Sequence, residues 1–467
     1  MFFIIKENSM TSIRNYLTPV KKGHLIGIGG VSMAPLAEVL AGMGLDISGS
    51  DMVNSEKIEY LRSLGIRVSI GHSAENLYPD TDFVVRTAAV RDDNPEIVAA
   101  NEMGIPVFER TQAWGTIMQD YKNALCIAGT HGKTTTTSMC THILMAAEKD
   151  PTVMIGGTLP LLHAGHRVGS GDTIVMESCE YYNSFHCFFP TVAVILNIDA
   201  DHLDFFEDLE DIKASFRKFA SLVPEDGHIV ANADDKNTMD ALVPLERKLV
   251  TFGLSPSADV YAEDIVTRGA QTDFTIMYKG KKYCRVNLRV PGLHNVKNAL
   301  AAATAAICMN IKPVAVRCGL SAFTGVKRRF EFKGKYNGAD VYDDYAHHPN
   351  EIRALLDAVE PLGYKRIIMV FQPHTYTRTN VLFDDFVEQL RRPDLTFLAE
   401  IYAARETNTI GISSSDLAHV IPNSLFFDNL EELEKSLRWT AAPGDIILTV
   451  GAGNIYKIGE RLVAGQK

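Results

Sequence analysis

The feature that most constrains the fold is the alternation of short apolar segments with stretches of helical length. From about residue 20 to 113, a stretch of helical length at 32–44 separates the first apolar segment from the second. The apolar segments in this region span residues 24–28, 46–49, 67–70 and 82–85. Strands separated by helices of this length form parallel βαβ units, because each helix returns the chain to the same end of the sheet. We therefore predict a doubly wound α/β domain here.

Two further α/β units follow. The second has apolar segments at 124–128, 173–176 and 192–196. Its later part, 260–290, is richer in turn residues and in alternation, which predicts an antiparallel excursion. An alanine-dense helix is expected at 295–309 and should close this unit by close packing. The third unit begins near residue 326, with strands expected near 341–342, 366–371 and 445–450.

Chain length agrees with this division. A chain of 467 residues is too long for one compact core, and ordinary domain sizes give about three domains. We predict an α/β protein with an N-terminal domain at 1–113, a central domain at 114–325 and a C-terminal domain at 326–467.

Composition argues against several classes of protein. Hydrophobic residues make up 46% and charged residues 22%, which are ordinary globular proportions, and no apolar stretch is long enough to cross a bilayer. The apolar opening at 1–5 is short and lacks the features of a secretory signal, so we expect a cytoplasmic protein. The 7 cysteines include no C-x-x-C pair and indicate neither a disulfide framework nor a zinc site. A net charge of -11 disfavours a general nucleic-acid surface.

The strongest chemical motif is a glycine-containing turn between the apolar segment at 124–128 and the next helix. Backbone N–H groups of such a turn can face phosphate oxygens, and the helix dipole adds to the attraction. Lys133 supplies a charge for the β- and γ-phosphates, and Thr134 supplies a hydroxyl for Mg²⁺. The spacing is shorter than in the general Walker pattern, so a turn that binds nothing stays open as the alternative. The motif consists of Gly129, Thr130, His131, Gly132, Lys133, Thr134 and Thr135.

Two residues that follow other strands are candidate partners for a metal ion at this loop. Magnesium at nucleotide sites prefers hard oxygen ligands, and Glu177 directly follows the segment at 173–176. His202 comes just past the segment at 192–196, where ligands gather in open α/β sheets. A histidine in such a place is, taken alone, more often a surface or capping residue. With that alternative open, the predicted metal ligands are Thr134, Glu177 and His202.

A second glycine-rich turn, at 27–32, lies between the first strand and the first helix. It is similar to a dinucleotide fingerprint, with Asp51 at a suitable distance for a ribose hydroxyl and Ser32 in place of the third glycine. Alone, this pattern favours an NAD-dependent oxidoreductase. The same geometry, however, receives any diphosphate at a helix N-terminus, including the pyrophosphate of a UDP-sugar.

Taken together, the motifs resemble those of the Mur ligases over nearly the whole chain. The order and spacing of the motifs carry this resemblance. They lie at residues 27–30, 49–51, 129–135, 197–202, 292–299, 328–330, 344–349 and 451–455. The resemblance implies an N-terminal Rossmann-like domain that binds UDP, a central P-loop ATPase domain, and a C-terminal Rossmann-like domain that carries the incoming amino acid.

The resemblance also implies roles for individual residues. It places Lys133 at the γ-phosphate of ATP and Arg378 at a substrate phosphate or carboxylate. In the third domain, His348 or its neighbour His347 is a candidate to orient or deprotonate the incoming amine, and a structural role for both stays open as the alternative. Further nucleotide contacts are implied for His294, Asn295, Asn298 and Arg329, with Arg328 as the alternative to Arg329. Contacts on the UDP side are implied for Gly29, Gly30, Ser32, Asp51 and His72.

The activity implied by the resemblance is ATP-dependent attachment of L-alanine to the lactyl carboxylate of UDP-N-acetylmuramate, in peptidoglycan precursor synthesis. An acyl phosphate would be the intermediate, and ADP and phosphate the products. ATP and Mg²⁺ are the implied cofactors. We expect a monomer or homodimer with no nucleic-acid or membrane partner.

Other activities stay open at this point. Within the same class they are a ligase that attaches a recycled tripeptide to UDP-N-acetylmuramate and, more distantly, a folylpolyglutamate synthetase. An NAD-dependent oxidoreductase would leave Lys133, Glu177 and His202 unexplained. A catalytically silent sugar-nucleotide sensor is the remaining alternative.

Overall fold

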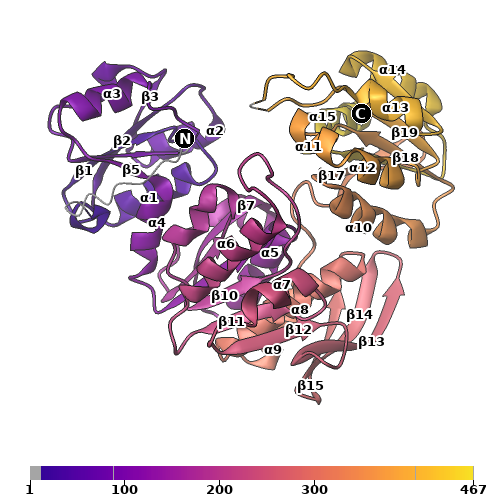
Figure 1. Cartoon of the computed structure of the whole chain (residues 1–467), viewed down its shortest axis with the longest axis horizontal. Coiled ribbons are helices and arrows are strands. Elements are labelled where there is room, and N and C mark those ends of the chain that lie inside the picture. The colour runs from indigo at the N-terminus through magenta and orange to yellow at the C-terminus, as the bar shows by residue number, and fades with distance from the viewer. Residues whose placement is uncertain (1–11, 88, 405, 466–467) are drawn as a thin grey trace.

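The computed structural model of the protein describes residues 12–87, 89–404 and 406–465. The apolar opening at 1–5 lies outside the described residues. Three sheets organise the chain, and Figure 1 shows the N-terminal and C-terminal domains on either side above the central one. The predicted three-domain α/β architecture is confirmed. The boundaries predicted at 113 and 325 stay predictions.

The N-terminal sheet is parallel, with strand order β3-β2-β1-β4-β5. Its strands are β1 (Lys22–Ile26), β2 (Asp46–Asp51), β3 (Arg67–Ile70), β4 (Phe83–Arg86) and β5 (Val107–Glu109). Helices α1 (Met33–Gly42), α2 (Glu56–Ser63) and α3 (Pro95–Glu102) connect them. The strand order reverses between β1 and β4, which is where ligands bind in open α/β sheets. The first strand ends two residues earlier than predicted, because Gly27 turns the chain with a φ of 77°.

The central sheet has 10 strands in the order β15-β14-β13-β12-β11-β10-β6-β9-β7-β8. Its parallel part comprises β6 (Asn123–Ala128), β7 (Thr152–Leu159), β9 (Thr173–Glu177), β10 (Val192–Ile195), β11 (His228–Asn232) and β12 (Leu249–Gly253). The predicted antiparallel excursion is confirmed as β13 (Val260–Arg268), β14 (Gln271–Tyr278) and β15 (Lys281–Leu288). The remaining elements are β8 (Ala164–Arg167), α5 (Lys133–Ala146), α6 (Leu209–Ser221), α7 (Lys236–Leu242), α8 (Leu293–Cys308) and α9 (Pro313–Ala322). The alanines of α8 are buried, so this helix packs closely over the sheet as predicted.

The C-terminal sheet has 6 strands in the order β16-β17-β21-β18-β19-β20, and β16 is antiparallel to β17. Its strands are β16 (Glu331–Tyr336), β17 (Ala339–Asp344), β18 (Arg366–Phe371), β19 (Leu395–Ala399), β20 (Ser424–Phe427) and β21 (Asp445–Val450). Its helices are α10 (Pro349–Val359), α11 (Tyr376–Val381), α12 (Phe383–Leu390), α13 (Ser414–Val420), α14 (Leu430–Thr440) and α15 (Tyr456–Ala464). The three predicted strands correspond to β17, β18 and β21.

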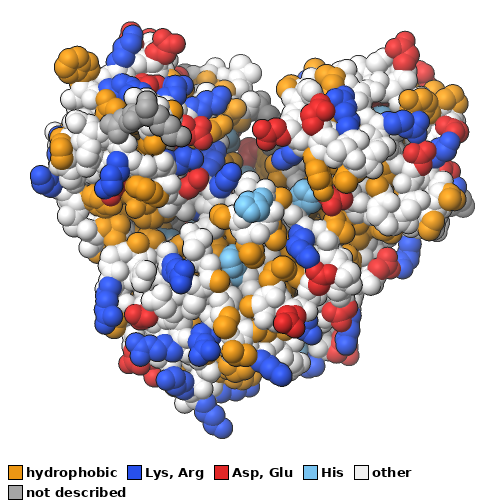
Figure 2. Space-filling model, turned by 180° about the vertical axis from the view of Figure 1, so that it is seen from behind, with side chains coloured by type: hydrophobic (Ala, Val, Ile, Leu, Met, Phe, Trp, Pro, Cys, Tyr) orange, Lys and Arg blue, Asp and Glu red, His pale blue; other side chains and the backbone are white. Residues whose placement is uncertain are grey.

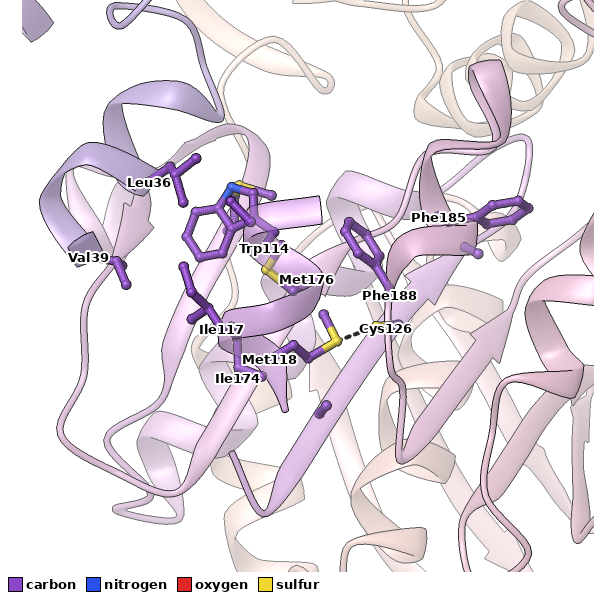
Figure 3. Packing of buried hydrophobic residues seen from close by; sticks show 14 of the residues in the cluster. Leu36, Val39, Trp114, Ile117, Met118, Cys126, Ile174, Met176, Phe185 and Phe188 are labelled. Carbon is purple, nitrogen blue, oxygen red and sulfur yellow. Dashed lines mark hydrogen bonds between the residues drawn. The ribbon is translucent and has the colours of Figure 1, made fainter. Parts of the chain in front are cut away.

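Helix α4 (Arg110–Met118) joins the N-terminal and central domains. Figure 3 shows Trp114 and Ile117 of α4 between Leu36 of α1 and the central strands. On the central side, the sulfur of Met118 lies 3.8 Å from Sγ of Cys126 in β6. Trp114 is only 1% exposed. The apolar surface that is buried around it holds the N-terminal domain against the central domain.

Gly115 lies within α4, where alanine would ordinarily stabilise a helix by about 1 kcal/mol. Here a Cβ atom would meet the backbone oxygen of Cys187 at 1.9 Å. We therefore expect Gly115→Ala to lower the free energy of unfolding by about 1–3 kcal/mol, because backbone atoms must move. Urea unfolding of Gly115→Ala would measure this. Gly42→Ala, whose Cβ meets nothing within 4 Å, is the matched control, and equal stability of the two variants would contradict the close contact.

Within the part of the chain that the structure describes, no helix combines the length and the apolar character needed to cross a membrane.

Candidate active site

The phosphate loop joins β6 to α5 in a conformation that requires glycine at both ends. Gly129 and Gly132 have φ values of 140° and 85°, which residues with a side chain rarely adopt. A Cβ atom at Gly132 would lie 2.7 Å from Oδ1 of Asn298. The backbone N–H of Thr130 donates to the carbonyl of Asn197 (3.1 Å), and the next N–H donates to the side-chain Oδ1 of the same asparagine (2.8 Å). The turn is therefore held in shape by protein contacts.

Lys133 lies at the start of α5 with its ammonium held from several sides. Its Nζ donates to the carbonyl oxygens of Gly129 (2.5 Å) and Thr130 (3.1 Å). It also contacts both carboxylate oxygens of Glu180, at 2.9 and 3.2 Å. Burial alone would lower the pKa of Lys133, but the charge of the buried Glu180 outweighs it and raises this pKa. Lys133 is therefore a fixed positive charge at the loop, and Glu180 is a partner that the motif did not reveal.

Lys133 lines a cavity of about 630 Å³ between the central and C-terminal domains. Figure 2 shows histidines gathered below the notch between the two upper lobes, on the opposite side from Figure 1. Although the chain is acidic overall, the cavity has basic side chains on its wall. They are Lys133, Lys327, Arg328, Arg329 and Lys333. The same wall also carries five carboxylates, so its charge is mixed: Glu177, Asp201, Glu331, Glu351 and Glu460. The basic groups among them can pair with an anionic ligand.

The predicted metal ligands line this same cavity. Thr134 donates its hydroxyl to Oε1 of Glu177 at 3.0 Å, and Oε2 of Glu177 accepts from the N–H of Gly156 at 2.6 Å. His202 reaches the cavity from the loop after β10, with a φ of 55° and its ring stacked on Tyr181 at 4.4 Å. Thr134 and Glu177 thus form a contacting pair of oxygen donors. That pair fits a hard divalent cation, and His202 lies in the wall beside it.

A second cavity, of about 180 Å³, adjoins the loop on the side of α8. Its wall combines apolar residues such as Phe252 with the predicted nucleotide-binding residues His294, Asn295 and Asn298. Burial lowers the pKa of His294 to about 4, so this ring is neutral near pH 7. Arg329 lines both cavities. An apolar slot with a few convergent polar groups is the usual form of a small-molecule site, and this one suits a neutral aromatic base.

The two neighbouring histidines of the C-terminal domain have different surroundings. His348 caps α10: its Nδ1 accepts from the N–H of Asn350 at 3.2 Å, and its Nε2 lies 3.4 Å from the carbonyl of Ala200. His347 instead lines the cavity of Lys133. Burial lowers the pKa of His347 to about 4, so the ring is neutral near pH 7. Of the two, His347 is the one that can meet a molecule in the cavity.

Arg378 joins the C-terminal domain to the central one. Its guanidinium contacts Oδ1 of Asp201 at 2.8 and 3.1 Å, and the side chains are only 10% and 9% exposed. Both residues line a small cavity next to His202. The structure therefore brings Arg378 to the edge of the predicted metal site, with its charge already paired to a carboxylate.

One cluster close to the phosphate loop has the composition of a metal site. Among the described residues, His131, Asp199 and His348 offer ligand atoms within 4.8 Å of one another. Burial would lower the pKa of His131, but hydrogen bonds to Asp199 and Glu351 outweigh it and raise this pKa to about 9. In this structure His131 forms ion pairs with Asp199 and Glu351 across the domain boundary.

The residues predicted on the UDP side gather in the N-terminal domain, separately from the phosphate loop. The N–H of Gly29 donates to Oδ2 of Asp51 at 2.9 Å. Nδ1 of His72 lies 3.0 Å from Oγ of Ser50 and 3.2 Å from Oε2 of the fully buried Glu96. These contacts join the turn after β1, where Gly30 also lies, to the end of β2 and the loop after β3. The carbonyl of Ser32 accepts from Nε1 of Trp114 at 3.1 Å.

Comparison with known proteins covers all three domains. The family models "Mur ligase family, catalytic domain", "Mur ligase middle domain" and "Mur ligase, glutamate ligase domain" match residues 22–122, 127–306 and 328–453. The chain is 46% identical over 446 residues to UDP-N-acetylmuramate–L-alanine ligase of Lachnospira eligens, covering 94% of this chain and 97% of that relative. The chain belongs to the Mur ligase family. The resemblance drawn from the motifs is confirmed.

Other Mur ligases are similar along nearly their whole length. The relative from Clostridium novyi, also a UDP-N-acetylmuramate–L-alanine ligase, is 45% identical, with 96% of this chain and 98% of the relative covered. The crystal structure of the UDP-N-acetylmuramate-alanine ligase of Thermotoga maritima matches with a TM-score of 0.79 and 32% identity, covering 95% and 98% of the two chains. A murein peptide ligase of Psychrobacter arcticus matches with a TM-score of 0.69 and 26% identity, covering 95% and 98%.

Proposed function

We propose that this Mur ligase attaches L-alanine to the lactyl carboxylate of UDP-N-acetylmuramate, using ATP and releasing ADP and phosphate. One observation carries the proposal: Lys133, the Thr134–Glu177 pair and His347 line a single cavity between two domains. The choice of amine rests on relatives 44–46% identical that bear the name of the L-alanine ligase. The murein peptide ligase is the second candidate, and its similarity is lower at 26% identity. A cytoplasmic monomer or homodimer stays our expectation.

The reaction requires activation of the acid, because a carboxylate is a poor electrophile at neutral pH. Transfer of the γ-phosphoryl group turns one carboxylate oxygen into a leaving group, and catalysis is then mainly positioning and charge neutralisation. The ammonium of Lys133 and the N–H groups of the turn between Gly129 and Gly132 would stabilise the transferring phosphoryl group. The slot beside His294 and Asn298 would hold the adenine.

Magnesium fits the Thr134 hydroxyl and the Glu177 carboxylate, with His202 as the further candidate ligand. When bound, Mg²⁺ supplies positive charge that neutralises phosphate oxygens. Because Oε2 of Glu177 already accepts from Gly156, the carboxylate is oriented before any ion binds. The protein thus supplies pre-positioned oxygen donors beside the phosphate loop.

We place the amine-handling role on His347 rather than on His348. Nδ1 of His347 lies 3.0 Å from the carbonyl oxygen of Tyr345. In the tautomer that carries its proton on Nδ1, the ring donates a hydrogen bond to this oxygen. The neutral ring then presents Nε2 as a hydrogen-bond acceptor that can orient the incoming amine. His348 uses its Nδ1 to cap α10. Attack of the deprotonated amine on the acyl phosphate forms a tetrahedral intermediate and expels phosphate.

In the N-terminal domain, the turn containing Gly29 and Gly30 would receive the diphosphate of the UDP-sugar at the start of α1. Asp51 would keep this turn in shape through the N–H of Gly29. His72, oriented by Ser50 and Glu96, would border the uridine.

Phosphate release from ATP tests the function directly. The purified protein is assayed with UDP-N-acetylmuramate and, separately, L-alanine, other amino acids or the tripeptide L-Ala-γ-D-Glu-meso-diaminopimelate. We expect release that requires L-alanine. Dependence on the tripeptide would support the second candidate, and no release with any amine would refute a ligase activity on this sugar nucleotide.

Replacing Glu177 with glutamine is expected to raise the Mg²⁺ concentration for half-maximal activity by at least about tenfold, because a charged oxygen ligand is lost. Glutamine keeps an acceptor for Gly156, so the fold should persist. Magnesium titration of the phosphate-release rate measures the effect. Glu225→Gln, an exposed site in the same domain, is the control, and an unchanged magnesium requirement in Glu177→Gln would remove Glu177 from the ligand set.

A further inference from the structure

Glu351 is a largely buried carboxylate in the first turn of α10, and its two oxygens have different partners. Oε2 accepts from the backbone N–H groups of His347 (3.0 Å) and His348 (3.4 Å), which is the contact of a capping box. Oε1 lies 3.5 Å from Nδ1 of His131 and 3.7 Å from the guanidinium of Arg329. One side of Glu351 therefore serves its own helix, and the other faces residues that belong to the nucleotide side.

These partners come from different parts of the site. His131 is a residue of the phosphate loop, and its other ring nitrogen lies 3.3 Å from Oδ2 of Asp199. Arg329 lies in the segment between α9 and β16, where the chain enters the C-terminal domain, and lines both cavities. The third partner is the side chain of His347, whose Nδ1 lies 3.3 Å from Oε2 of Glu351. The carboxylate of Glu351 thus contacts the phosphate loop, the segment before β16 and His347, the residue to which we assign the handling of the amine.

The charges around Glu351 favour a fixed arrangement. Burial alone would raise the pKa of Glu351, but the surrounding positive groups hold it well below its usual range, so the group is ionised near pH 7. His131 faces Asp199, Glu351 and the ring of His348, whose centroid is 4.8 Å away. With its raised pKa, His131 carries a proton between two carboxylates. Such charge-assisted contacts are strong when they are largely removed from water.

We propose that Glu351 is a positioning residue that couples the phosphate loop to the amine-handling His347 when the C-terminal domain is docked. This inference rests on the proposed ligase function. Its physical basis is that one ionised carboxylate of the C-terminal domain orients His131 and Arg329 through Oε1 and His347 through Oε2. Small displacements of such groups cost large factors in rate, because the reacting atoms must meet within a narrow geometry.

A purely structural role as a helix cap is the alternative, and the chain offers a matched comparison. Asp416 makes the same capping contact in α13 of the same domain: its side chain accepts from the N–H of Ser413 at 2.9 Å. Asp416 is exposed and lines none of the cavities described above. Asp416→Asn and Glu351→Gln therefore change a capping carboxylate to an amide in the same way, but only one of them removes charge from the site.

The test is steady-state phosphate release by the full-length protein, with kcat and KM measured for ATP and for L-alanine. For Glu351→Gln we expect kcat/KM to fall on the order of 10- to 100-fold for both substrates. Asp416→Asn should stay within about twofold of the unchanged protein, because exposed surface changes have small effects. His131→Gln leaves the cap of α10 untouched. This variant should show the same fall in kcat/KM for ATP and a smaller fall in kcat/KM for L-alanine.

The outcomes separate the inference from the proposed function. Equal kinetics of Glu351→Gln and Asp416→Asn, or a loss in Glu351→Gln that affects only one of the two substrates, would overturn the coupling. Should Glu351→Gln fail to fold, His131→Gln decides: unchanged kcat/KM for ATP in that variant would overturn the inference. Failure of the unchanged protein to release phosphate with any amine is a different result, because it refutes the proposed function itself.

Discussion

Replacing Lys133 with alanine is expected to lower ATP-dependent phosphate release by at least about 100- to 1000-fold, because a fixed charge at the transferring phosphoryl group is lost. Binding of UDP-N-acetylmuramate should persist, since the UDP-side residues lie in the N-terminal domain and do not contact Lys133. The rate is measured by phosphate release, and binding by isothermal titration calorimetry. Lys236→Ala, an exposed change in the same domain, is the control for the loss of a lysine.

The contact with Glu180 makes a second comparison necessary. Removing Lys133 leaves a carboxylate that is only 3% exposed without its partner, and an unpaired buried charge destabilises the fold. The double variant Lys133→Ala/Glu180→Gln removes that charge and should regain thermal stability without regaining turnover. Recovery of turnover in the double variant would show that Lys133 itself is dispensable, and loss of UDP-substrate binding in a folded single variant would contradict the division of labour between the domains.

Sequence alone could predict the parts of the site that are local or that follow from strand order. The phosphate loop is continuous in the chain, so its glycines and Lys133 could be recognised together. The Thr134–Glu177 contact follows from topology: β6 and β9 are parallel neighbours, with Ile127 opposite Glu177, so their carboxyl ends deliver residues to the same place. The three sheets were predictable for the same reason, since alternation of strands and helices fixes parallel units.

The contacts that join the domains could not be predicted from the sequence. Asp201 and Arg378 are 177 residues apart, and no motif links them. Glu180 carries no signal of its own in the sequence, because its pairing with Lys133 depends on how the chain turns after β9. These pairs depend on docking of folded units, and a pattern within one segment carries no information about that docking.

The choice between His347 and His348 did have a local signal. Pro349 begins α10, and proline is favoured at the first helical position, so the preceding His348 becomes the cap residue. Glu351 stands three residues after that cap, as in a capping box. Reading this pattern would have assigned His348 to the helix end and left His347 to face the cavity. Catalytic roles are thus better assigned to residues after the ends of the helices have been located in the sequence.

Replacing Arg378 with alanine is expected to be the second severe change, because it acts on the fold and on the reaction together. Breaking the pair with the equally buried Asp201 should cost about 3–5 kcal/mol of domain docking, since a carboxylate is left without its partner. Arg378 and His202 line the same small cavity. Loss of the Arg378 guanidinium from this cavity should lower kcat/KM for UDP-N-acetylmuramate by at least about 100-fold. Thermal unfolding and steady-state phosphate release measure the two effects, with Arg391→Ala, an exposed change in the same domain, as the control.

The double variant Arg378→Ala/Asp201→Asn separates docking from substrate contact. If Arg378 serves only to neutralise Asp201, removing both charges should restore stability and most of the activity. If Arg378 also meets a phosphate or carboxylate of the substrate, stability returns while kcat/KM stays low, and this is the result we expect. The reason is that Arg378 lines a small cavity next to His202, where a second anion can share the five N–H donors of one guanidinium. Recovery of full activity in the double variant would limit Arg378 to holding the two domains together.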